Sequence, residues 1–203
     1  MSYGFFATVS RMKYINRWAL MRSTREENLS EHSLEVAMIA HGLCVISNVR
    51  YGHHLDADRA ALIGLYHDAQ EIITGDMPTP VKYCNDTIRD AYWAVERSAK
   101  EHLLSRLPED LRQEYEKILT EPEDSSGEER YLRRLVKAAD KLSALIKCIE
   151  ERNSGNLEFR SAEASTRKSI EEMEEELPAV GDFLREFLPA YGKTLDELTE
   201  ELP

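Results

Sequence analysis

The sequence has few cysteines. Cys44, Cys84 and Cys148 are the three in a chain of 203 residues. They are odd in number, far apart and never in a C-x-x-C pair, which argues against a disulfide framework or a thiolate zinc site. We expect three buried, reduced thiols. The first residues also lack a basic segment followed by an apolar one, so we predict no signal peptide and expect a cytoplasmic protein.

Long apolar runs and an excess of basic charge are absent too. The sequence has no run of about 18 apolar residues, so we predict no transmembrane helix and expect no association with membranes. Lys and Arg number 26 against 38 Asp and Glu, and the net charge of −12 argues against binding to polymeric nucleic acid. Residues 1–25 differ, because they hold five basic residues and no acidic one. This segment either holds a small anion or lies as a basic leader on an acidic body.

Alternating β-branched stretches are also missing. Leu outnumbers Val by 23 to 8, and apolar residues recur at helical spacing almost throughout. We therefore predict an all-α fold. No linker marks a boundary, and the length suits a single helical-bundle domain over residues 1–203.

Caps and apolar faces predict where the helices lie. The first covers about residues 3–12, and the second begins at Ser30 as its N-cap. The expected apolar face of the second helix comprises Leu34, Met38, Leu43 and Ile46. The third helix follows Asp56 and continues to Gly75 as its C′ residue. Further helices are predicted over about residues 81–107, 109–119, 130–152 and 156–177, with short pieces near Phe183 and Leu195.

The segment His67-Asp68-Ala69-Gln70-Glu71 is the most informative part of the chain. On one continuous helix, His67, Asp68 and Glu71 project to neighbouring parts of one face. Imidazole and carboxylate both bind borderline divalent metals, although a His-Asp pair is also common as an ordinary polar pair. The pattern is not the zinc-protease H-E-x-x-H, because Glu71 stands where the second histidine would be.

Two further residues favour a metal site. His32 lies in the first turn of the second helix, and Asp140 lies on the apolar side of the helix predicted over residues 130–152. A carboxylate there is costly unless it binds a cation or pairs with Arg or Lys, and both readings remain open. His41, nine residues after His32, falls on the opposite face and is expected to be a core histidine. Glycine-rich phosphate loops such as G-x-x-x-x-G-K-[ST] and G-x-G-x-x-G are absent.

The order His, His-Asp, Asp on three helices resembles the HD-domain superfamily of metal-dependent phosphohydrolases. The strings INRWALMR, NLSEHSLEVAMIAH, YHDAQEIITGDMPTPVKY and VKAADKLSALIKCIEE closely resemble the bacterial 5′-deoxynucleotidases of that superfamily. The resemblance extends from about residue 5 to residue 151. It implies an HD-type domain with the metal-site core in this range and C-terminal helices, residues 156–203, packed on it.

The resemblance also implies a function and a set of site residues. The reaction is hydrolysis of deoxyribonucleoside 5′-monophosphates to deoxynucleoside and phosphate by a homodimer that uses one divalent cation, Co²⁺ or Mn²⁺. The implied metal ligands are His32, His67, Asp68 and Asp140. Glu71 is the implied catalytic carboxylate, with help from Asp76. The implied substrate contacts are Arg17, Trp18, Asp76, Met77, Pro78 and Thr79, together with His32, Asp68 and Asp140.

The residue types agree with these roles, and each has an ordinary alternative. Arg17 offers a planar fork to phosphate oxygens. Trp18 offers a flat face to a sugar or serves as a core anchor. Asp76 follows the helix-ending Gly75 and is either a pocket residue or a turn aspartate. The alternative functions are an HD phosphohydrolase for triphosphates, cyclic nucleotides or guanosine tetraphosphate, and a silent nucleotide sensor. The intact ligand set and Glu71 disfavour the sensor.

Overall fold

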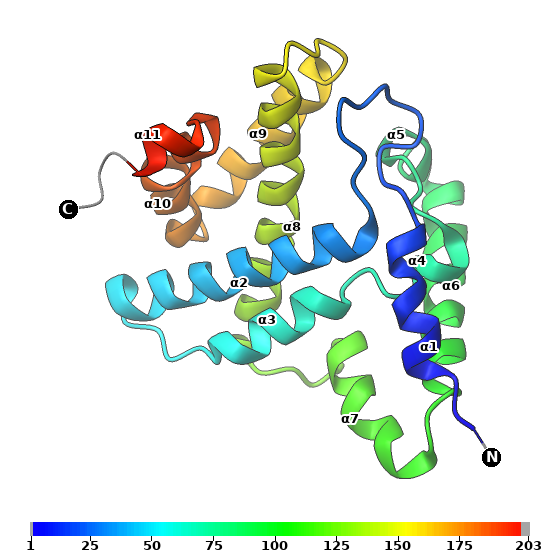
Figure 1. The fold of residues 1–203 in the computed structure, drawn as a ribbon. Coiled ribbons are helices and arrows are strands. Elements are labelled where there is room, and N and C mark those ends of the chain that lie inside the picture. The colour runs from blue at the N-terminus through cyan, green and yellow to red at the C-terminus, as the bar shows by residue number, and fades with distance from the viewer. Residues whose placement is uncertain (1, 200–203) are drawn as a thin grey trace.

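The computed structural model describes residues 2–199, which are built from helices (Figure 1). The bounds are α1 Phe5–Val9, η1 Ser10–Tyr14, α2 Leu29–Tyr51, α3 Ala57–Tyr66, α4 Glu71–Thr74, α5 Thr79–Lys82, α6 Asp86–Leu104, α7 Glu109–Leu119, α8 Gly127–Asn153, α9 Arg160–Glu174, α10 Pro178–Glu186, η2 Leu188–Gly192 and α11 Leu195–Thr199. Within residues 2–199 there is no strand, only an isolated antiparallel bridge between Asn16 and Asn28. The all-α prediction is confirmed. The predicted domain includes residues 1 and 200–203, which lie outside the described part.

The main core lies where α2, α3 and α8 pack together. Leu43, Leu135 and Leu142 are fully buried there, and α9 and α10 add Ile170 and Val180. In Figure 1, α2 and α3 cross α8 side by side, and α9 and α10 lie along α8 and α2. Burial of this apolar surface brings the start of α2, the end of α3 and the middle of α8 to one place.

A second, smaller core joins α1 to α6 and α7. Its members include Phe5, Leu103, Leu104 and Leu119, all buried. The Phe5 ring packs against the ring of Tyr115 on α7, with the two ring centroids 4.7 Å apart. This core fixes the basic N-terminal segment to the body of the protein.

The N-cap of helix α2 lies two residues before the predicted one. The side chain of Asn28, not Ser30, accepts hydrogen bonds from Ser30 N and Glu31 N, and Glu31 accepts one from Asn28 N. This is a capping box, in which two otherwise unpaired donors at the helix start are satisfied reciprocally. Asparagine is as good a cap as serine, so the residue types alone do not show which of Asn28 and Ser30 caps the helix.

The buried face of α2 also differs from the prediction. Leu43 is buried, but Leu34 and Met38 are 54% and 61% exposed, and His41, expected in the core, is exposed as well. The reason is that α2 is apolar on almost every side, so its sequence does not show which side packs on α3 and α8. By length and composition α2 is also the one helix of the described residues apolar enough to cross a membrane, and half of that segment is buried inside the protein.

The third helix is not continuous to Gly75. Asp56 caps it as predicted, but α3 ends at Tyr66 and α4 starts at Glu71. Between them, Ala69 N and Glu71 N donate to the carbonyls three residues earlier, those of Tyr66 and Asp68. This tight turn carries His67 and Asp68, so the argument from one continuous helical face does not hold. Gly75, with φ of 71°, ends α4.

The region predicted as one helix over residues 81–107 is two helices. Asn85 accepts a hydrogen bond from Ile88 N and caps α6, which separates α6 from the short α5. Cys44 and Cys148 are buried as expected, but Cys84 is exposed because it lies in the turn between α5 and α6.

Gly64 allows α3 to approach α2 closely. A Cβ atom at Gly64 would lie 2.8 Å from Ala37 Cα and 3.0 Å from Ala37 N, both backbone atoms of α2. We therefore expect Gly64→Ala to lower the free energy of unfolding by about 1–3 kcal/mol, the usual cost of overpacking. Gly42→Ala on α2 is the control, because a Cβ at Gly42 meets nothing within 4 Å and alanine favours a helix. Urea denaturation measures both. Equal stability of wild type and Gly64→Ala contradicts the close approach.

Candidate active site

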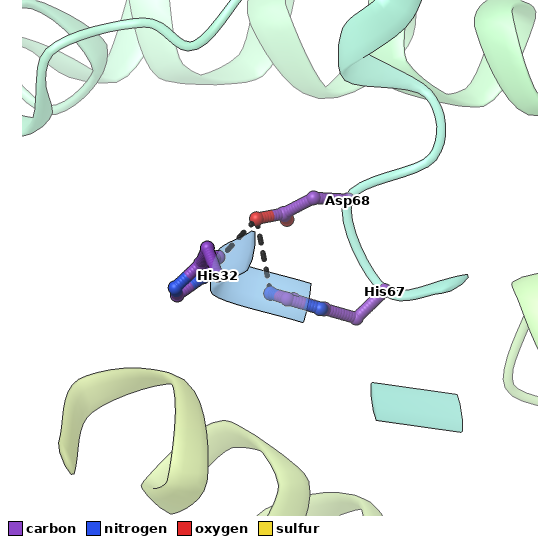
Figure 2. Close-up of side chains that lie close together, drawn as sticks. All are labelled: His32, His67 and Asp68. Atoms are coloured by element: carbon purple, nitrogen blue, oxygen red, sulfur yellow. Dashed lines mark ion pairs between the residues drawn. The ribbon is translucent and has the colours of Figure 1, made fainter. Parts of the chain in front are cut away.

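Four predicted residues from three elements meet at the crossing of α2, α3 and α8. His32 comes from the first turn of α2, His67 and Asp68 from the turn after α3, and Asp140 from α8. His67 Nε2 lies 3.0 Å from Asp68 Oδ2 and 3.9 Å from Asp140 Oδ1. His32 Nε2 lies 3.1 Å from Asp140 Oδ1 and 3.6 Å from Asp68 Oδ2. Figure 2 shows Asp68 directed toward both histidines.

These four side chains have the chemistry and spacing of a site for one divalent cation. Donor atoms around such a cation lie about 3–3.5 Å apart, because each bond is about 2.1 Å long. His32, His67 and Asp68 each offer one donor atom, an imidazole nitrogen or a carboxylate oxygen, and these three atoms lie within 4.8 Å of one another. His67 Nδ1 donates to the carbonyl of Gly64 at 2.8 Å, so that in the neutral ring the lone pair lies on Nε2. Nε2 is buried and faces the carboxylates of Asp68 and Asp140, as expected for a metal-binding nitrogen.

The charges of the cluster favour a cation at its centre. Burial lowers the pKa of His67, but Asp68 and Asp140 outweigh this and hold the pKa well above its ordinary value. Burial and the Arg17 guanidinium lower the pKa of His32, so that this ring is neutral. A neutral imidazole is the form that binds metals. The field that attracts a proton to His67 also attracts a metal ion.

Glu71 lies beside the cluster at the start of α4. Its side chain is buried, and Oε2 has no hydrogen-bond partner among the described residues. Burial, followed by the charges of Asp68 and Asp76, raises the pKa of Glu71 to about 9. Glu71 therefore holds a proton at neutral pH in the metal-free site, and it can donate this proton to a reacting group.

Arg17 and Trp18 are held by one carboxylate that the sequence reasoning missed. Glu27 Oε2 accepts hydrogen bonds from Arg17 Nη1 at 3.0 Å and from Trp18 Nε1 at 2.9 Å. The backbone N–H of Trp18 donates to Asp76 Oδ2 at 3.3 Å, and the Trp18 ring packs on Phe159 at 5.2 Å. The one signal for Glu27 is that it and Glu26 are the first acidic residues after the acid-free segment.

The rest of the N-terminal segment is anchored to α8. The carboxylate of Glu151, which is buried, accepts hydrogen bonds from Thr24 N and Thr24 Oγ1, both at 2.8 Å. It also accepts from Lys147 Nζ at 2.5 Å and Asn156 Nδ2 at 2.7 Å. The helix that carries Asp140 therefore also holds the segment that carries Arg17 and Trp18.

The predicted pocket loop is only partly brought to the cluster. Asp76 is close, because it accepts from Trp18 and its charge acts on Glu71. Met77 and Pro78 are half-buried and Thr79 is exposed at the start of α5. Among the described residues, these three make no side-chain hydrogen bond to the cluster. Their roles toward a nucleotide stay predictions.

Fold and site together define the class of HD-domain phosphohydrolases. The structure of an HD-domain phosphohydrolase from Listeria innocua matches with a TM-score of 0.78 and 28% identity, over 97% of this chain and 95% of that chain. The HD phosphohydrolase of cyanophage S-2L, solved with dA and one catalytic Zn²⁺ ion, matches with a TM-score of 0.63 over 93% of this chain and 96% of that chain. At 18% identity, the second match shows the fold alone.

The sequence comparison identifies the family. A family model described as 5′-deoxynucleotidase YfbR-like matches residues 4–191. A 5′-deoxynucleotidase of Enterobacter sp. (strain 638) is 44% identical over 199 residues, which cover 98% of this chain and 97% of the relative. The chain belongs to the YfbR-like 5′-deoxynucleotidase family.

The cluster predicts that metal uptake depends on His67. We expect His67→Ala to abolish binding of Mn²⁺ or Co²⁺, because it removes a buried ring nitrogen that faces Asp68 and Asp140 in the cluster. His41→Ala is the control, since His41 is an exposed histidine of α2. Elemental analysis after dialysis measures occupancy. Metal should also raise the melting temperature of the wild type but not of His67→Ala. Full occupancy in His67→Ala contradicts the assignment.

Proposed function

We propose that this protein is a 5′-deoxynucleotidase that removes the 5′-phosphate from deoxyribonucleoside 5′-monophosphates. The observation that carries the proposal is the two-histidine, two-aspartate cluster around the buried His32, with Arg17 and the protonated Glu71 next to it. A metal site, a cationic fork and an acid are the parts that phosphate-ester hydrolysis needs. Family membership agrees with this reaction.

His32, His67, Asp68 and Asp140 would hold one divalent cation, which we propose is Co²⁺ or Mn²⁺. The mixed nitrogen and oxygen donors suit these borderline metals. When bound, the cation polarises a phosphate oxygen and lowers the pKa of a water molecule.

Arg17 binds the phosphate in this proposal. Its Nη1 donates to Glu27 and lies 2.8 Å from His32 Nδ1, but its Nε–H is buried with no acceptor among the described residues. A buried donor without an acceptor is costly, and a phosphate oxygen would supply one through a charge-assisted hydrogen bond. Arg17 also offsets the negative charge that a phosphate brings to a site with several carboxylates.

Glu71 acts as the general acid. As water attacks phosphorus, the bond from phosphorus to the 5′-oxygen breaks and this oxygen takes up the proton of Glu71. One proton of the attacking water stays on the product phosphate and the other passes to solvent, from which Glu71 is protonated again. In the metal-free site the raised pKa of Glu71 keeps this proton in place at neutral pH. Asp76 supports this role, because its charge is one of those that raise the pKa of Glu71.

Trp18 follows Arg17, the residue proposed to bind the phosphate, and this position suggests how the sugar is selected. The Trp18 ring can fill the space that a 2′-hydroxyl needs, and an apolar wall rejects a hydroxyl by roughly 10²-fold. Met77, Pro78 and Thr79 would line the rest of the nucleotide pocket.

The test is phosphate release from a panel of ribonucleotides and deoxyribonucleotides with Mn²⁺ or Co²⁺. We expect dAMP to be preferred to AMP, and Trp18→Ala to reduce both this preference and the activity on dAMP. Trp93→Ala is the control, because Trp93 is an exposed tryptophan of α6. An unchanged preference in Trp18→Ala places the selectivity elsewhere. Release only from triphosphates, cyclic nucleotides or guanosine tetraphosphate, or from no nucleotide at all, contradicts the proposed reaction.

The role of Glu71 predicts a separation of binding from chemistry. Glu71→Gln keeps the size of the side chain but has no acidic proton, so kcat should fall by about 10²–10⁴. Metal and dAMP affinity, measured by calorimetry, should be retained. Wild-type kcat should fall as pH rises through the pKa of Glu71 in the loaded enzyme, and the variant should lack this decline. Loss of metal from Glu71→Gln would instead make Glu71 a ligand.

We further propose that the enzyme is a cytoplasmic homodimer. An exposed apolar stripe on α2 supports the dimer, because its members are 41–78% exposed: Leu34, Met38, Val45 and Val49. A helix that is apolar on all sides is normally covered on all sides, and a twofold-related copy would cover this stripe with itself. Sedimentation should then give twice the mass of the 23.3-kDa chain.

A further inference from the structure

His32 Nδ1 is the ring nitrogen that faces away from the cluster. It has two hydrogen-bonding neighbours, and they favour opposite protonation states of this nitrogen. Ser143 Oγ lies at 3.0 Å and Arg17 Nη1 at 2.8 Å. A guanidinium only donates, so Arg17 needs a bare lone pair on Nδ1. A serine hydroxyl can donate or accept. The position of the proton on His32 therefore depends on what holds the Ser143 hydroxyl.

Glu35 holds that hydroxyl. Ser143 Oγ donates to Glu35 Oε2 at 2.5 Å. The single hydroxyl proton is then used, and Ser143 Oγ is left as an acceptor for an N–H at His32 Nδ1. Ser143 is fully buried on α8, one turn after Asp140, and Glu35 lies one turn after His32 on α2. The three residues form a chain from Glu35 through Ser143 to His32.

The two tautomers of His32 differ in their ability to bind a metal. With the proton on Nδ1, the ring donates to Ser143 and presents the Nε2 lone pair to Asp68 and Asp140. With the proton on Nε2, the ring accepts from Arg17 and donates to Asp140 Oδ1, 3.1 Å away. The second form has no lone pair for a cation. The surroundings hold partners for both forms.

We infer that Ser143 and Glu35 are positioning residues that hold His32 in its metal-binding tautomer against the pull of Arg17. The inference rests on the metal site of the proposed function. It adds two residues outside the ligand set, and one of them, Glu35, makes no hydrogen bond or ion pair to the metal ligands or the proposed substrate contacts within residues 2–199. A buried serine bonded to a carboxylate would otherwise have only a packing role.

The first test measures metal affinity without turnover. Mn²⁺ titration by calorimetry should show about 10–100-fold weaker binding for Ser143→Ala and Glu35→Ala, the usual range for partners of a ligand histidine. Because Glu35 acts through Ser143, the double variant should bind no more weakly than Ser143→Ala alone. Ser143→Thr, which keeps the hydroxyl, should bind like the wild type. Ser47→Ala is the control, because Ser47 is a buried serine of α2 whose Oγ has no partner among the described residues.

The second test observes the tautomer directly. Nitrogen-15 NMR of the metal-free wild type should place the His32 proton on Nδ1, and Ser143→Ala should move it to Nε2. Wild-type affinity in Ser143→Ala and Glu35→Ala, or additive losses in the double variant, overturns the inference. A proton on Nε2 in the wild type also overturns it. If the wild type binds no Mn²⁺, the proposed metal site fails, while the tautomer spectrum still decides whether Ser143 and Glu35 orient His32.

Discussion

The site depends on the close approach of α2 and α3 at Ala37 and Gly64. The missing side chain of Gly64 allows the two backbones to meet, and its carbonyl then accepts the Nδ1–H of His67. One residue thus sets both the distance between two helices and the direction of a donor nitrogen. The turn after α3 places Asp68 against the same point, and α8 completes the cluster with Asp140.

Charge in this region is arranged in two layers. The inner layer is the cluster, where Asp68 and Asp140 favour a cation beside two histidines. The outer layer is Glu27 and Glu151, which hold the N-terminal segment through hydrogen bonds, and Glu27 Oε1 also lies 4.0 Å from His32 Nδ1. The basic segment noted in the sequence is therefore tied to acidic partners at Glu27 and Glu151. This agrees with the reading in which the segment lies on an acidic body, and the anion-binding reading stays a prediction.

The sequence predicted the helical class from helical spacing, and the four metal ligands that it proposed with the help of the family resemblance lie together in the structure. Helical spacing marks α8 over its length, and His32, His67, Asp68 and Asp140 stand out because polar groups in apolar helices need partners. What it did not predict depends on tertiary packing. The α2 sequence is apolar all round, so Leu34 and Met38 were assigned to the core although α3 and α8 cover the other side. The tight turn at His67 is set by local hydrogen bonds that periodicity does not reveal. Glu27, Glu35 and Ser143 are common residue types, and their importance comes only from what lies across the fold.

The backbone of Trp18 is held in a strained conformation. Trp18 is the one non-glycine residue of the described chain with positive φ, 60°, a conformation that costs a bulky residue about 1–3 kcal/mol. Glycine would relieve that cost and remove the ring at the same time. The glycine would also lose the ring contact with Phe159 and the hydrogen bond to Glu27. The strained backbone of Trp18 is therefore offset by the contacts of its own indole ring, which no smaller residue with an unstrained backbone would make.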